Sequence, residues 1–230
     1  MLLRSLRARG FVGPRYEGLT GKLRFLAQAL ICRTEVVLHI ARKDPLPPLA
    51  DTGDLEVRWI RRFEDLAPFR DELERAYYPG LLDTWRAPFT WGERVALGLA
   101  AGKVVVFVWA QSGGGRGSVG WFGPLLDGEC RVSRMGVLPA ERGRAYLSRF
   151  LTLLLPQLFA EGHERVFSEV VIDNEPSLKA HLRTGFKAIG LARVAGSLLG
   201  GRVVLWRAVP DDVARMLERL AVPPADRTGR

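Results

Sequence analysis

The stretch that most constrains the fold of this chain is residues 131–190, which opens as RVSRMGVLPAERGRAYLSRFL and closes as EVVIDNEPSLKAHLRTGFKAIG. The opening part predicts a strand, a short basic turn and an apolar helix. The closing part predicts a strand and then a helix that starts at Pro176, with Asn174 or Glu175 just before it. The remaining segments are best understood by their position before or after these two units.

The basic turn between the first strand and its helix has the composition of an anion-binding site. The first N–H groups of a helix lack intrahelical partners, and the helix dipole favours negative charge at that end. Arg142 and Arg144 add positive charge, and Gly143 permits close approach of the backbone. Helix starts of this composition are common, so an ordinary solvated loop explains the turn at least as well when it is taken alone.

Taken together, VLPAERGRA and NEPSLKAHLRTGF resemble the GNAT superfamily of acyl-CoA-dependent N-acyltransferases. The resemblance is specific over residues 131–190, extends by strand order over about 55–208, and does not include residues 1–50. It implies an α/β (α+β) fold: a mixed, mostly antiparallel central sheet flanked by helices. In that sheet a central parallel strand pair splays apart to admit the acyl-CoA arm.

The expected domain organisation follows from the same resemblance and from composition. Residues 1–50 are expected to be a basic N-terminal extension that contains an amphipathic helix and a strand. Residues 51–210 are expected to be the GNAT-like acyltransferase domain, and residues 211–230 a C-terminal helix with a polar tail.

The resemblance also implies where acyl-CoA, expected as acetyl-CoA, would bind as co-substrate. Backbone groups around Met135, Gly136 and Val137 would pair with the pantetheine arm as another strand would. Asn174 and Ser177 would fix the arm from the other side. The diphosphate would lie over the backbone N–H groups of one continuous stretch, Arg142, Gly143, Arg144, Ala145, Tyr146 and Leu147.

The predicted pyrophosphate loop departs from the family's usual Gln/Arg-x-x-Gly-x-Gly/Ala pattern. Arg142 matches the first position, whereas Ala145 replaces the first glycine and Leu147 replaces the second small residue. Alanine is tolerated at position 145 if the backbone there is helical, because only a positive φ requires glycine. Leu147 would either crowd the cofactor or point into the core.

Acyl transfer to an amine needs a base that takes the amine proton and an acid that protonates the leaving thiolate. Glu169, on the strand that leads into the splay, is the preferred base; a salt-bridged surface glutamate is the alternative, and Glu129 is a weaker candidate. His181 occupies the position where many family members carry a tyrosine that serves as general acid. The resemblance therefore implies that His181 is the acid, against the alternative of a polar residue on a helix edge.

Composition sets the broad class of the protein. A chain of 230 residues with 47% apolar and 26% charged residues suits one sizeable globular core. The net charge of +9 favours anionic partners. Cys32 and Cys130 match no disulfide or metal pattern, which indicates a reducing cytoplasm. No metal site is predicted, because the histidines lack ligand spacing: His39, His163 and His181.

The N-terminal segment carries much of the charge. Residues 1–50 hold nine lysines and arginines against three acidic residues, a balance of +6. Leu23, Leu26 and Leu30 predict a basic amphipathic helix, which either packs on the domain or brings residues 1–43 to an anionic membrane surface. The sequence has no secretory signal at its start, and its apolar runs are too short to span a bilayer. The expected location is the cytoplasm, with peripheral contact at the inner membrane surface as an alternative.

Four further elements are expected along the chain. Residues 63–77 predict a helix with Leu66, Phe69, Leu73 and Tyr77 on one face. The aromatic segment 77–91 follows, and another short helix is expected after it. The aromatic residues are expected either to be core or, as the resemblance implies, to border the acceptor pocket. Residues 103–124 predict a hairpin around a glycine-rich turn. Residues 186–209 predict a final antiparallel pair.

Two functions from different classes follow from these observations. The first is an N-acyltransferase that moves an acyl group from acyl-CoA to a small or bulky amine. The second is a catalytically silent GNAT-like module that binds acyl-CoA, an anionic polymer or a membrane surface. Nucleic acid is not an expected partner, and a homodimer is left open.

Overall fold

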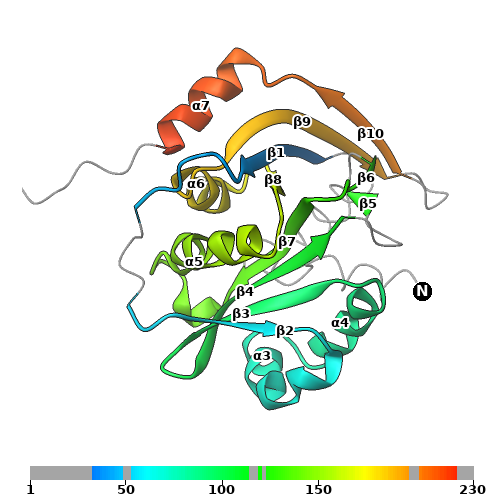
Figure 1. The fold of residues 1–230 in the computed structure, drawn as a ribbon, viewed down its shortest axis with the longest axis vertical. Coiled ribbons are helices and arrows are strands. Elements are labelled where there is room, and N and C mark those ends of the chain that lie inside the picture. The colour runs from blue at the N-terminus through cyan, green and yellow to red at the C-terminus, as the bar shows by residue number, and fades with distance from the viewer. Residues whose placement is uncertain (1–32, 49–52, 114–118, 121–122, 197–201, 222–230) are drawn as a thin grey trace, which may run out of the picture.

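The computed structural model describes residues 33–48, 53–113, 119–120, 123–196 and 202–221. Within them the chain forms an eight-stranded sheet in the order β10-β9-β1-β8-β7-β4-β3-β2 (Figure 1). Helices lie on both faces, which confirms the predicted mixed sheet flanked by helices. The strands of this sheet are β1 (Arg33–Ala41), β2 (Glu56–Ile60), β3 (Arg94–Ala100), β4 (Lys103–Ser112), β7 (Glu129–Val137), β8 (Arg165–Val171), β9 (Lys187–Gly196) and β10 (Arg202–Arg207).

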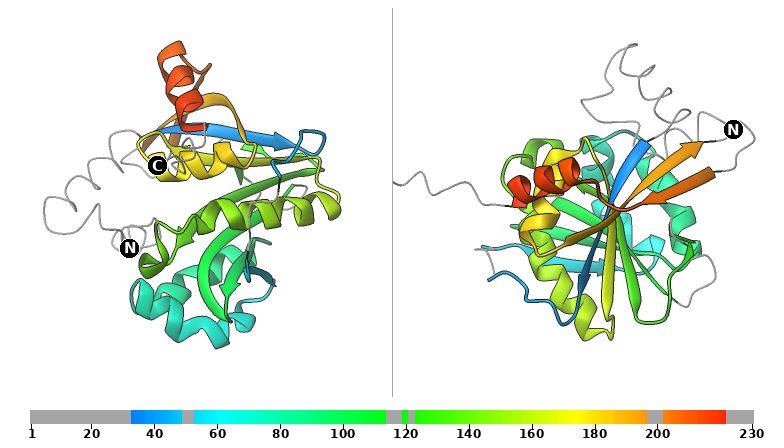
Figure 2. Two further views of the ribbon diagram at one scale, coloured as in Figure 1. Left: turned by 90° about the vertical axis from the view of Figure 1, so that its left-hand side faces the viewer. Right: turned by 90° about the horizontal axis from the view of Figure 1, so that it is seen from above.

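The helices divide between the two faces of the sheet (Figure 1, Figure 2). One face carries α5 (Tyr146–Ala160), α6 (Glu175–Arg183) and α7 (Asp211–Ala221), with α7 packed against α6. The other face carries the 3-10 helix η2 (Phe63–Phe69), α3 (Arg70–Ala76) and α4 (Leu81–Thr90). Two separate apolar cores therefore lie on either side of the strands.

A parallel strand pair lies at the centre of the sheet. Among the described strands, only β7 and β8 run parallel, and they pair from Glu129↔Arg165 to Val132↔Ser168. Both strands then continue, to Val137 and to Val171, beyond their last paired residues. This confirms the predicted splayed pair and defines a fork that opens after residues 132 and 168.

The strand predicted from TEVVLHIA is β1, and it lies between β8 and β9. Val36, Leu38 and Ile40 on β1 are fully buried in the core under α5 and α6. Residues 33–41 of the segment expected as an extension are therefore an inner strand of the main sheet. The amphipathic helix predicted around Leu26 lies outside the described residues.

Helix α5 is the main apolar contact with the sheet. Phe150, Leu151, Leu154 and Leu158 are fully buried on its inner face, as predicted. The helix continues through Pro156, so this proline does not end it. Pro156 is exposed, and water can therefore hydrate the carbonyl group that proline leaves without its helical N–H donor.

Two predictions for residues 92–124 are wrong. The segment after Trp91 forms strand β3 and not a short helix. The prediction failed because an apolar run that is buried on both faces lacks the alternation by which a strand is told from a helix in the sequence. The predicted hairpin is also absent, since β4 pairs with β3 and β7. The residues after β4 form instead a small antiparallel pair of their own, β5 (Val119–Gly120) and β6 (Gly123–Pro124).

Candidate active site

A β-bulge in β7 sets the direction of the backbone at the fork. The register between β4 and β7 shifts between Phe107 and Trp109, so Arg134 and Met135 together oppose Val108. Arg134 adopts a left-handed conformation with φ 44°. A bulge of this kind locally bends the strand and exchanges which peptide groups face the neighbouring strand.

The peptide groups of Met135 and Val137 face the fork. After the bulge, the Leu138 N–H donates to the Val105 carbonyl of the β4 side at 2.9 Å. Because alternate residues of an antiparallel strand bond to the same neighbour, the peptide groups of Met135 and Val137 point away from β4. The structure therefore places the two predicted backbone contacts on the open side of β7.

The predicted pyrophosphate loop ends in the N-terminus of α5. Gly143 has φ 84°, and Ala145, which precedes the helix, has φ 56°. The first α-helical bond runs from the Arg149 N–H to the Ala145 carbonyl, so the preceding N–H groups of the first turn point outward. That turn contains no acidic residue. The side chain of Arg142 is exposed and makes no ion pair with a described residue, whereas Arg144 pairs with Glu141 at 2.9 Å.

The two departures from the family's loop pattern have different outcomes. Ala145 is not helical but left-handed, so the condition under which alanine was expected to be tolerated there is not met. An alanine in that conformation costs about 1–2 kcal/mol because its Cβ crowds the following carbonyl. Leu147 packs against the core under α5, and its side chain therefore leaves the loop clear.

Ala145→Gly is expected to stabilise the protein by about 1 kcal/mol, because glycine adopts a positive φ without steric cost. The measurement is the free energy of unfolding from denaturant titration. Ala140→Gly, at an exposed position in the preceding 3-10 helix, is the matched control and should destabilise the protein slightly. Equal destabilisation by both changes would contradict the assignment of strain to residue 145.

The start of α6 provides the opposite wall of the fork. Pro176 occupies the first turn of α6 and Asn174 is its N-cap, as predicted. The Asn174 N–H donates to the Val171 carbonyl at 2.8 Å, which fixes this residue directly after β8. Its exposed side chain makes no capping hydrogen bond to the helix. Asn174 and the half-buried Ser177 therefore lie just after the end of β8, and their contact with the pantetheine arm stays a prediction.

His181 is fully buried and lies against Ser168, the β8 residue after which the fork opens. Its side chain is 0% exposed, Nε2 is 2.9 Å from Ser168 Oγ, and Nδ1 is 2.7 Å from the Ser177 carbonyl. The carbonyl can only accept, so Nδ1 donates to it and Nε2 accepts from the hydroxyl. Burial lowers the pKa of His181 to about 4, which keeps the ring neutral. A buried neutral imidazole with both nitrogens bonded does not suit the predicted role of proton donor.

Acid is expected to destabilise the fold through His181. Its pKa is about 4 in the folded protein and near 6.5 when unfolded, so its stabilising contribution is present above pH 6.5 and is lost as the pH falls towards 4. The loss is roughly 3 kcal/mol, or about 1.4 kcal/mol for each pH unit. Unfolding measurements between pH 7 and 4.5 should show a steeper decline for the native protein than for His181→Gln. An NMR titration in which His181 protonates near pH 6.5 would contradict this.

Glu169 is the first residue of β8 after its pairing with β7 ends. Its carboxylate is 5% exposed and lies 3.9 Å from the Arg131 guanidinium, which stabilises its negative charge. The strand register places Glu35 of β1 and Gln111 of β4 on the same face as this pair. All four side chains are largely buried and form a polar row across four adjacent strands.

Glu129 does not suit the role of an alternative base. It lies at the closed end of the parallel pair, opposite Arg165 in the register. One carboxylate oxygen is 3.3 Å from the Arg165 guanidinium, and the other accepts from the Leu126 N–H at 3.0 Å. These contacts give Glu129 a structural role in the turn before β7.

Two further polar contacts at the fork were not predicted. The Tyr77 hydroxyl donates to the Val137 carbonyl at 3.1 Å. The Arg134 guanidinium pairs with the buried Glu93 carboxylate, lies 4.8 Å over the Trp109 ring, and has its pKa lowered to about 10 by burial. The many aromatic residues in 77–91 indicated that this segment packs near the site, but not that the Tyr77 hydroxyl contacts Val137. The second depends on the bulge, which redirects Arg134.

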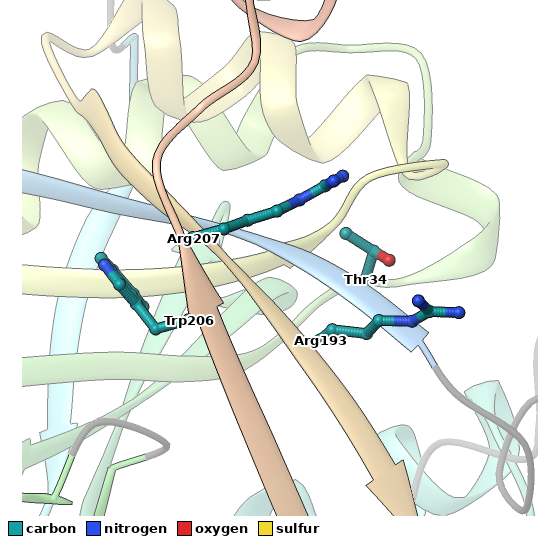
Figure 3. A pocket seen from close by; sticks show the side chains of 4 residues that line it. All are labelled: Thr34, Arg193, Trp206 and Arg207. Atoms are coloured by element: carbon teal, nitrogen blue, oxygen red, sulfur yellow. The ribbon is translucent and has the colours of Figure 1, made fainter.

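A cavity of about 210 Å³ lies elsewhere, at the β10 edge of the sheet. Figure 3 shows Thr34, Arg193 and Arg207 on one side of β10 and Trp206 on the other. Neither arginine makes an ion pair with a described residue. The cavity is basic, and none of the predicted site residues lines it.

The described residues contain no group of three or more His, Cys, Asp or Glu side chains placed to hold a metal ion. Cys130 is buried, and burial raises the pKa of its thiol to about 12, so it is not a reactive thiolate. Cys32 lies outside the described residues. No described helix has the length and apolar character needed to cross a membrane.

Comparison with protein families gives a match over residues 56–186 to the acetyltransferase (GNAT) family. The match spans more than half of the chain and includes both the basic loop and the start of α6. This protein belongs to the GNAT acetyltransferase family. No curated protein has significant sequence similarity to it.

Solved structures share the fold at low sequence identity. A GNAT-family acetyltransferase from Colwellia psychrerythraea has a TM-score of 0.50 at 15% identity and covers 83% of this chain. A GCN5-related N-acetyltransferase from Sphaerobacter thermophilus has a TM-score of 0.51 at 16% identity and covers 77% of it. This chain spans 62% and 57% of the length of those two proteins.

The aminoglycoside acetyltransferase AAC(6′)-Ib, solved in complex with coenzyme A and kanamycin, is similar over nearly its whole length. Its TM-score is 0.50 at 14% identity, and the match covers 70% of this chain and 98% of that protein.

Proposed function

We propose that this protein is an N-acyltransferase that uses acyl-CoA, expected as acetyl-CoA, and an amine acceptor. The observation that carries the proposal is the fork between β7 and β8, with Glu169 as its first β8 residue. Three groups surround the opening: the Met135 and Val137 peptide groups, the N-terminus of α5 and Asn174. They supply hydrogen-bonding groups for an arm and positive charge for a diphosphate.

The residues present fit the co-substrate by the chemistry of their donors. The first turn of α5 offers N–H groups and helix-dipole charge without an opposing carboxylate. Arg142 adds a guanidinium, which binds phosphate oxygens through charge-assisted hydrogen bonds. The bound co-substrate would supply an activated thioester. The protein would supply the direction of the arm and the site of the acceptor.

In this proposal Glu169 is the general base. It accepts a proton from the amine while the amine nitrogen forms its bond to the acyl carbon and the carbon–sulfur bond breaks. Arg131 and the polar row would hold the carboxylate in one orientation. Since His181 is buried and neutral, the proposal assigns no protein acid to the leaving sulfur. An alkyl thiol has a pKa near 8.5, so a thiolate can leave close to neutral pH.

In the superfamily the segment equivalent to residues 77–91 borders the acceptor pocket, and its aromatic content here suggests a bulky or apolar amine. The rings of Trp85 and Phe107 are 4.9 Å apart, and those of Trp85 and Trp109 are 5.3 Å apart. This aromatic group packs between α4 and the sheet, on the same face as Glu169. We therefore expect an amine with an apolar or aromatic body.

The test is a screen of diverse amines with acetyl-CoA and longer acyl-CoA donors, followed by free thiol release. Amine-dependent release confirmed by mass of the acylated product would support the proposal. If the protein binds CoA but none of the tested amines causes thiol release, the result would favour the silent binding module. That alternative is favoured by one observation, the absence of an exposed acid at position 181.

A further inference from the structure

The Val137 carbonyl accepts a hydrogen bond from a side chain of the protein itself. Val137 faces the open side of β7, and its carbonyl accepts from the Tyr77 hydroxyl at 3.1 Å. Tyr77 is the residue directly after α3, so it comes from the face that carries the aromatic group and not from β8. A side chain of the acceptor-side helices thus occupies a hydrogen-bonding position of the cofactor slot.

The sequence makes room for this contact at Gly136. A Cβ atom at that position would lie 2.7 Å from the Tyr77 hydroxyl and 2.6 Å from the Phe107 ring. The Tyr77 ring is held edge-on to Phe107, with 5.8 Å between centroids. Gly136 therefore allows the phenol to approach the strand, and Phe107 fixes its direction.

The hydroxyl acts here as a hydrogen-bond donor and not as an acid. Burial raises the pKa of Tyr77 to about 12, despite the opposing effect of the Arg142 cation. The phenol is therefore protonated at every working pH. The hydroxyl donates to the Val137 carbonyl, which would otherwise lack this hydrogen bond. A buried polar group without a partner destabilises the fold.

We infer that Tyr77 is a placeholder in the cofactor slot: its hydroxyl bonds the Val137 carbonyl in the empty protein and gives up that bond when an amide N–H of the arm replaces it. The inference rests on the proposed function, because it needs an arm that pairs with β7. Exchange of the bond frees Tyr77 and so couples occupation of the slot to the segment between α3 and α4. The hydroxyl stabilises the empty state and weakens binding.

The test uses the full chain, CoA as the probe, and Tyr77→Phe, which keeps the ring against Phe107 and removes only the hydroxyl. Stability and affinity should move in opposite directions, so both the melting temperature and the Kd should fall. The melting temperature of the empty protein should fall by about 2–4 °C. The Kd for CoA, measured by calorimetry, should decrease by about fivefold, the equivalent of one net hydrogen bond of about 1 kcal/mol.

Thr184→Val is the matched control. It removes a buried hydroxyl at the end of α6 that donates to the Ala180 carbonyl at 3.1 Å. This control should lower the melting temperature and leave the Kd for CoA unchanged. A Tyr77→Phe protein that binds CoA equally or more weakly overturns the placeholder. Failure of the native protein to bind CoA would instead overturn the proposed function itself.

Discussion

Glu169→Gln is expected to lower turnover of an accepted amine by at least about a hundredfold, the lower range for loss of a general base. Glutamine keeps the shape of the side chain but cannot take the amine proton. The Kd for acyl-CoA should remain within about twofold, because no predicted contact with the arm or the diphosphate uses this carboxylate. Steady-state kinetics and calorimetry with the same protein sample provide both values.

The pH profile separates a base from a structural glutamate. For the native protein, turnover should fall on the acid side as the base becomes protonated, and Glu169→Gln should lose that limb. Removal of one charge from the buried pair with Arg131 also destabilises the fold, so melting temperature must be measured alongside. Glu164→Gln, at an exposed position just before β8, is the control and should retain full turnover. Undiminished activity in Glu169→Gln would remove the base assignment.

Arg142→Glu is expected to remove most of the stabilisation by CoA. In the native protein, CoA at a hundred times its Kd should stabilise the fold by about 2.7 kcal/mol through preferential binding to the folded state. The variant loses a charge-assisted contact and places an anion beside the diphosphate position, so the Kd should rise by about a hundredfold. The measurement is the melting temperature with increasing CoA.

Arg215→Glu makes the same charge change on the exposed side of α7. This control separates a local effect from the general loss of positive charge, which would also weaken binding of an anion. The control should keep the thermal shift of the native protein. Equal loss in both variants, or an unchanged shift in Arg142→Glu, would contradict the diphosphate site at the start of α5.

The elements closest to the two sequence motifs were predictable. Hydrophobic periodicity, Pro176 and the basic turn predicted strand β7, helix α5, strand β8 and helix α6, and the resemblance to the GNAT superfamily implied the fork. Predictions failed where neighbours in space decide the outcome. Strand β3 is buried on both faces, so its apolar run carries no period. Nothing local to β4 indicates that its partner is β7 instead of the segment after the glycine-rich turn.

The sequence predicted where the candidate site residues lie along the chain, but not how buried they are or which groups they contact. Spacing identified the loop and Asn174, which are set by short-range structure. His181 was matched by its distance from Asn174, but its burial depends on Ser168 of β8 and on the helix packing of α6. The direction of Arg134 and the contact of Tyr77 with Val137 both depend on a bulge, and no single residue type marks a bulge in advance.

The position of β1 has a consequence for how the chain is made. Glu35 pairs with Val171 on one side and with Ala192 on the other, so this early strand reaches its place only after almost the whole chain exists. At a synthesis rate of roughly 5–20 residues per second, β1 waits on the order of ten seconds with its apolar side chains uncovered. Pairings of such long sequence separation also slow folding itself, because loop closure precedes any gain in contacts. Folding of the sheet is therefore expected to be completed after translation, with the nascent β1 strand as the segment that most needs protection from aggregation.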